Sequence, residues 1–79
     1  MLIRFAPARN DADARERLAQ LVTAQREDYA GLSRMIGRPA GYLGRYVREG
    51  VPARLSAREA QDMADYLRVE RCELLHEAA

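Results

Sequence analysis

Six arginines but only one acid lie between residues 34 and 58 of this 79-residue chain, so positively charged guanidinium groups are concentrated in this segment. The arginines are Arg34, Arg38, Arg45, Arg48, Arg54 and Arg58, and the acid is Glu49. A guanidinium presents its N–H donors in a planar fork that matches a phosphate or the O6/N7 edge of guanine. Residues 1–33 are neutral and residues 59–79 carry two arginines against six acids, so the net charge of +1 conceals a basic segment. This segregation predicts one face that binds a polyanion.

Every cation in the chain is an arginine, since the thirteen basic residues include no lysine. Bidentate recognition of phosphate and guanine favours arginine over lysine, but a GC-rich genome produces the same bias. Both explanations stay open at this point.

Cys72 and His76 could direct two ligands at one metal ion, because they are four residues apart in a predicted helix. Tetrahedral zinc needs four ligands, and the chain has no other cysteine or histidine. We therefore expect no metal site and interpret Cys72 as a small core residue. No glycine-rich phosphate loop precedes a helix, so we also expect no enzymatic activity, no cofactor and no small-molecule substrate.

Two short amphipathic helices are expected in residues 29–50, where they would position the central arginines. Apolar residues recur at i, i+3, i+4 spacing on both sides of Gly37, first as Leu32, Met35 and Ile36 and then as Leu43, Tyr46 and Val47. Gly37 suits a turn with positive φ, and Pro39 suits the first position of a helix. Gly50 closes the second helix, which we expect over residues 39–49. Ser33 is small enough to let the two helices cross closely.

The run LSRMIGRPAGYLGRYVREGVPARLSAREAQDMADYLRV resembles the DNA-binding domain of lambda-repressor-like (Cro/C1, XRE-type) regulators. The small residue, the glycine turn, the aliphatic residue in the second helix and Arg48-Glu49-Gly50 followed by a proline carry this resemblance. It is closest to the N-terminal domain of repressors fused to a LexA-like S24 peptidase. The resemblance implies an all-α, five-helix domain with a helix-turn-helix motif at 29–50, whose second helix enters the DNA major groove. The peptidase of such proteins resembles a Ser-Lys design, which a chain without lysine does not contain.

The candidate DNA-contacting residues combine long donors with small side chains. They are Tyr29, Arg34, Arg38, Ala40, Gly41, Tyr42, Gly44, Arg45, Arg48, Arg54 and Arg58. On a helical wheel the small residues share the face of Arg45 and Arg48, opposite Leu43 and Val47, so the helix could approach the groove floor. For Tyr42, packing on the body, a phosphate contact and a thymine methyl contact are equal alternatives. Tyr29 is a plausible phosphate contact.

The rest of the chain is expected to form a scaffold. Residues 1–9 form an extended arm or a disordered start, and residues 10–79 form the domain. Asn10 or Asp11 caps a first helix, and Ser56 with Glu59 forms a capping box before another. The expected core comprises Leu18, Leu21, Val22, Leu32, Ile36, Leu43, Val47, Met63, Ala64 and Leu67.

Two classes of function remain from the sequence. The first is a cytoplasmic DNA-binding transcription regulator, a small repressor that binds an inverted-repeat operator as a homodimer. The second is a protein-interaction module that keeps this fold without binding DNA. No apolar run reaches the length of a membrane span, and no signal-peptide h-region is present. The expected dimer interface is the last helix with Val69, Leu74 and Leu75, and the alternative is the arm with Leu2, Ile3 and Phe5.

Overall fold

The protein is an all-α domain, as the sequence predicts. The computed structural model describes residues 7–76, and this part of the chain contains helices without any strand. The helices are α1 (Asp11–Ala24), α2 (Tyr29–Met35), α3 (Tyr42–Glu49), α4 (Ala57–Leu67) and α5 (Arg71–Leu74). The expected arm residues Leu2, Ile3 and Phe5 lie outside the described range.

Side-chain caps begin the longer helices where the sequence indicated. Asn10 accepts a hydrogen bond from the Asp13 amide at 2.7 Å and so caps α1. Ser56 and Glu59 form the predicted capping box of α4. Asp28 caps α2 through the Gly31 amide, an interaction that the sequence analysis did not anticipate.

Two glycines have the positive φ that was predicted for the turn after α2 and for the end of α3. Gly37 has a φ of 77° in the connection between α2 and α3, and Gly50 has a φ of 70° at the end of α3. The expected start of the second helix at Pro39 is wrong. Pro39 instead accepts a bond from the Tyr42 amide in a turn, and α3 begins at Tyr42 with Gly41 as its N-cap. Helix α3 is therefore shorter than the expected helix over residues 39–49.

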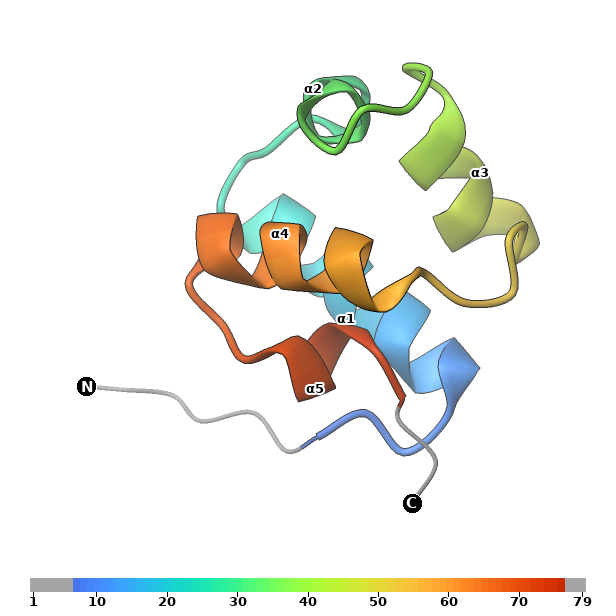
Figure 1. The fold of residues 1–79 in the computed structure, drawn as a ribbon, viewed down its shortest axis with the longest axis vertical. Helices are drawn as coiled ribbons and strands as arrows, with labels where there is room; N and C mark the ends of the chain where they lie inside the picture. The colour runs from blue at the N-terminus through green and yellow to red at the C-terminus, as the bar shows by residue number, and fades with distance from the viewer. Residues whose placement is uncertain (1–6, 77–79) are drawn as a thin grey trace.

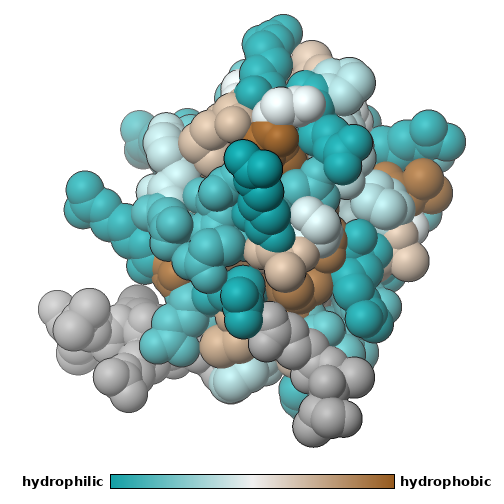
Figure 2. Space-filling view, in the orientation of Figure 1, coloured by the Kyte–Doolittle hydropathy of each residue, from teal (hydrophilic) through white to brown (hydrophobic). Residues whose placement is uncertain are grey.

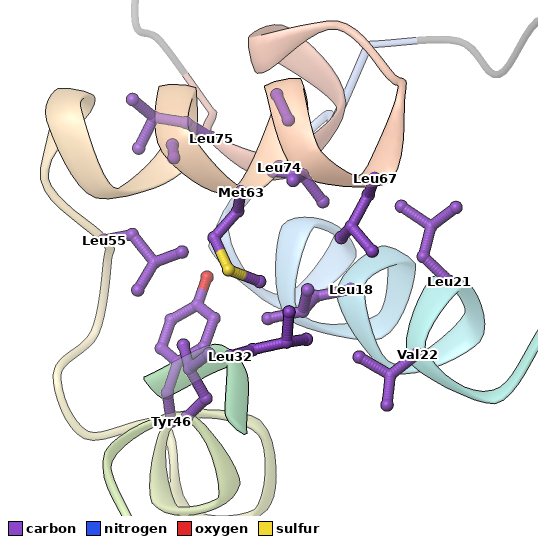
Figure 3. Packing of buried hydrophobic residues seen from close by; sticks show 13 residues of the cluster. Leu18, Leu21, Val22, Leu32, Tyr46, Leu55, Met63, Leu67, Leu74 and Leu75 are labelled. Carbon is purple, nitrogen blue, oxygen red and sulfur yellow. The ribbon is translucent and has the colours of Figure 1, made fainter. Parts of the chain in front are cut away.

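One apolar core joins all five helices (Figure 3). It comprises Leu18, Leu21, Val22, Leu32, Leu43, Tyr46, Leu55, Ala60, Met63, Ala64, Leu67, Leu74 and Leu75. All predicted core residues belong to it except Ile36 and Val47, which are half-buried and pack against it. Tyr46 reaches from α3 toward Met63 of α4, and burial raises its pKa to about 12.

The helices form two regions at opposite ends of the molecule (Figure 1). Helices α2 and α3 pack against each other at one end, whereas α5 lies at the other end and contacts α1 and α4. Helix α1 contacts both α3 and α5 and so connects the two regions. Within the described residues, no helix is long and apolar enough to cross a membrane. The fold therefore presents α3 at the end opposite α5, with α1 and α4 supporting it.

Candidate nucleic-acid interface

A single serine hydroxyl joins α2 to α3. Ser33 is fully buried, and its Oγ donates to the Tyr29 carbonyl at 2.7 Å. The same oxygen accepts a hydrogen bond from the Leu43 amide at 3.0 Å, which is one of the early α3 amides without an intrahelical partner. The sequence indicated only that Ser33 is small, so this bond was not predicted. The signal that could have revealed this bond is the polar Ser33 next to Leu32, a predicted core residue.

A buried carboxylate fastens the α2–α3 turn to α4. Glu59 is 6% exposed and accepts hydrogen bonds from Arg38 Nε at 2.6 Å and from the Tyr42 hydroxyl at 3.1 Å. The Arg38 guanidinium also lies over the Tyr42 ring, 5.0 Å from its centroid. Tyr42 therefore packs on the body, one of its three predicted roles. Arg38, a predicted DNA contact, has its Nε committed to Glu59.

These bonds keep Glu59 ionised. Burial is the largest single influence and by itself would raise the pKa of the Glu59 carboxyl. Hydrogen bonds from the Ser56 amide, Arg38 and Tyr42 together outweigh burial, so the pKa lies below its ordinary 4.5. Burial and the Glu59 charge also raise the pKa of Tyr42, which keeps its hydroxyl protonated as a donor.

The outer face of α3 exposes two arginines beside small residues. The side chains of Arg45 and Arg48 are exposed, that of Arg45 to 62%. Arg45 lies 3.9 Å from Glu49, a loose surface pair that contributes little. Gly41 is exposed as predicted, and the half-buried Ala40 lies in the turn before the helix. Hydrophilic side chains cover most of the face seen in Figure 2, and apolar patches show between them.

Gly44 is buried, although it was expected among the small residues of the DNA-contacting face. The guanidinium of Arg48 lies closest to the position that a Cβ at Gly44 would take.

The remaining predicted contacts divide into free and paired arginines. Arg34 and Arg58 are exposed and make no ion pair within residues 7–76. Arg54 pairs instead with Asp11 at the start of α1, at 3.1 Å. Tyr29 is half-buried, and burial raises its pKa although the charge of Arg48 opposes this shift. The structure thus ties Arg54 to the scaffold.

The last helix of the chain packs against the domain itself. Leu74 and Leu75 were expected at a dimer interface, but they are 1% and 6% exposed within the single chain. Contacts of α5 with α1 and α4 bury them. Val69 is half-buried, and of the last-helix group only this residue retains some exposed surface.

Cys72 and His76 lie beside the backbone of Ala8. His76 Nδ1 lies 3.1 Å from the Ala8 carbonyl, and the Ala8 amide donates to the Cys72 carbonyl at 2.8 Å. Burial and the Glu70 carboxylate raise the pKa of the Cys72 thiol, which disfavours the thiolate that metals bind. Among residues 7–76, no three His, Cys, Asp or Glu side chains gather as metal ligands.

A mostly apolar hollow of about 380 Å³ opens beside the N-terminal part of α3. Pro39, Gly41, Tyr42, Arg45, Val51 and Pro52 line it. Val51 is 45% exposed there, so the surface next to Arg45 is partly hydrophobic.

Comparison of the chain with protein-family models, with curated proteins and with solved structures finds no significant match.

Proposed function

We propose that this protein is a sequence-specific DNA-binding regulator, a small repressor with a lambda-repressor-like helix-turn-helix domain. One observation carries the proposal: α3, the second of two short helices joined by a glycine turn, exposes Arg45 and Arg48 on its outer face. The Ser33 bond and the Glu59 anchor hold α3 rigidly relative to the body. A rigid helix with exposed donors suits insertion into the major groove.

The residues on the outer face of α3 and around it would have different roles in binding DNA. Arg45 is the base-reading candidate, because a guanidinium donates to O6 and N7 of guanine at once. The exposed Gly41 leaves space for the groove wall at the start of α3. Arg34, Arg48 and Arg58, with Tyr29, are the phosphate candidates. Arg38 and Arg54 contribute less, since Glu59 and Asp11 already neutralise them.

The size of the domain supports action as a homodimer. Its extents are 31 × 29 × 20 Å, so one copy covers about one 34 Å turn of DNA. One short helix reads only a few base pairs, each contributing about 1–3 kcal/mol of selectivity. A two-fold dimer on an inverted repeat provides two base-contacting helices and places the two α3 helices in successive major grooves.

Selection of duplexes from a random pool, followed by titration of Arg45→Ala, tests the reading role. The parent should enrich one site, and Arg45→Ala should bind that site about 10- to 100-fold more weakly, with relaxed selectivity. Arg68→Ala is the matched control, because Arg68 is exposed at the far end of α4. If Arg45→Ala binds every sequence as the parent does, α3 is not the reading helix.

The second candidate is a protein-interaction module. The hollow beside Arg45 favours it, because its proline and valine lining offers apolar surface to a partner. Val51→Ser discriminates between the two candidates, because it removes apolar surface from the hollow without adding a charge beside Arg45. It should weaken partner binding by such a module, but it should leave the sequence preference of a DNA reader unchanged.

A further inference from the structure

Two hydrogen bonds fasten the N-terminal end of α3 to the body. Ser33 accepts a bond from the amide of Leu43, and Glu59 accepts one from the hydroxyl of Tyr42, and these two donors are the first two residues of α3. Arg45 lies farther along the helix. Beyond the packing of the apolar face of α3, its direction therefore also depends on what holds the C-terminal end.

A side chain from α1 reaches the C-terminal end of α3. Arg15 Nη1 donates a hydrogen bond to the Ala53 carbonyl at 3.1 Å, across 38 residues of sequence. The same guanidinium lies beside Gly50, the C-cap of α3. Its Cζ is 3.5 Å from the position that a Cβ at Gly50 would take, and its Nε and Nη1 are 3.8 Å from that position. One half-buried side chain thus contacts both the end of α3 and the loop that follows it.

The charge of Arg15 suits this place. The last carbonyl groups of a helix lack intrahelical partners and carry partial negative charge, so a cation beside them is favourable. Arg15 therefore stabilises the end of α3 both through its bond to the loop and through its charge.

The loop makes a second contact with α1. Arg54 donates to Asp11 through Nε at 3.1 Å and through Nη2 at 3.4 Å. Asp11 and Arg15 are four residues apart in α1, so they lie on the same side of that helix. Two adjacent loop residues, Ala53 and Arg54, are therefore bound to one face of α1.

We propose that Arg15 is a positioning residue for base recognition: it binds the end of α3 and the following loop to α1, and so fixes the direction in which α3 presents Arg45 to the major groove. This inference rests on the proposed function. A guanidinium that donates to O6 and N7 of one guanine must satisfy two distances at once, so it tolerates little rotation of its helix. Phosphate contacts tolerate more, because each phosphate offers several oxygens and carries no sequence information. Loss of Arg15 should therefore weaken binding to the selected site more than binding to other DNA.

Arg15→Met tests this role, because methionine keeps an unbranched side chain without the charge or the donors. Arg17→Met is the matched control, since Arg17 lies on the same helix but pairs with Glu73 of α5 at 3.7 Å. Both variants lose one positive charge from α1, so both should bind random duplex DNA equally well. Arg15→Met should bind the selected site about tenfold more weakly than Arg17→Met, because the contact with guanine is misaligned.

Arg15→Lys is the second variant, and it preserves the comparison if Arg15→Met does not fold. Lysine keeps the charge and can donate to the Ala53 carbonyl, but it lacks the planar group that lies beside Gly50. Its selectivity should fall about threefold, between the parent and Arg15→Met. If the Arg15 variants select the site as well as Arg17→Met does, Arg15 contributes only its charge or contacts a phosphate itself, and the inference is overturned.

Hydrogen exchange without DNA separates the inference from the proposed function. The Gly50 amide donates to the Tyr46 carbonyl at 3.0 Å at the end of α3 that Arg15 holds, whereas the Leu43 amide donates to Ser33 at the other end. In the Arg15 variants, exchange of the Gly50 amide should accelerate about tenfold more than exchange of the Leu43 amide. Equal acceleration would mean that Arg15 stabilises the domain as a whole, and this would overturn the inference whether or not the protein binds DNA.

The remaining outcome concerns the proposed function. If exchange at Gly50 accelerates as expected but the parent binds no DNA, the proposed function is refuted, and the role of Arg15 in base recognition is refuted with it.

Discussion

At the scale of single residues, the contact between α2 and α3 depends on the Ser33 hydroxyl. We predict that Ser33→Ala lowers the free energy of unfolding by about 1–3 kcal/mol, because the buried Leu43 amide loses its acceptor. Urea denaturation measures this change. Ser33→Cys keeps a small side chain with a weak acceptor and should be destabilised as well. An alanine variant as stable as the parent would mean that only the size of Ser33 matters.

Glu59 gives the domain a dependence on acid. Its folded pKa is lowered, so the stabilisation that it contributes is fully present above the unfolded value of 4.5 and is lost as the pH falls through the folded pKa. We predict that the free energy of unfolding declines below about pH 4.5, and that Glu59→Gln makes this decline shallower. Glutamine can still form the capping box through its one oxygen. Its NH2 group cannot accept from Arg38, so the variant removes the charge together with one acceptor.

At neutral pH, Glu59→Gln should cost about 1–2 kcal/mol, because Arg38 loses an ionised partner but remains half exposed to water. Chemical denaturation at several pH values measures both effects. A variant with the same pH profile as the parent would assign the acid sensitivity to other carboxylates.

At the scale of helices, local signals predicted most of the secondary structure. The Asn10 cap, the capping box at Ser56 and the turn glycines act within a few residues of the chain, so the sequence displays them directly. The start of α3 was misjudged because Pro39 suits a turn as well as a helix start, and the bond from the Tyr42 amide selects the turn.

Long-range pairings explain what the sequence did not predict about the candidate site. Arg38 and Glu59 are 21 residues apart, and Arg54 and Asp11 are 43 residues apart, so no local pattern reveals that these cations are neutralised. The burial of Leu74 likewise depends on the distant helix α1. The arginines of α3 were predicted as an exposed pair because helical spacing alone places them opposite Leu43.

At the scale of the whole molecule, oligomeric state is the next prediction. We expect a homodimer, but not through Leu75. Leu75→Glu should unfold the domain, because it buries an unpaired carboxylate in a domain of this size, whose free energy of unfolding is only a few kcal/mol. Val69→Glu is the matched variant at the half-buried position, and light scattering should find it folded and monomeric. A parent that is monomeric both free and on its selected DNA would refute the dimer.

We propose that the basic face around α3 binds the DNA backbone and reads bases through the major groove. Titration of labelled duplex DNA with the parent protein, at about 50 and 200 mM salt, tests it most directly. We predict binding to duplex DNA that weakens steeply with salt, with a slope near −0.9 for each neutralised phosphate. Affinity that does not change between the two salt concentrations, or no binding at either, would refute DNA binding by this face.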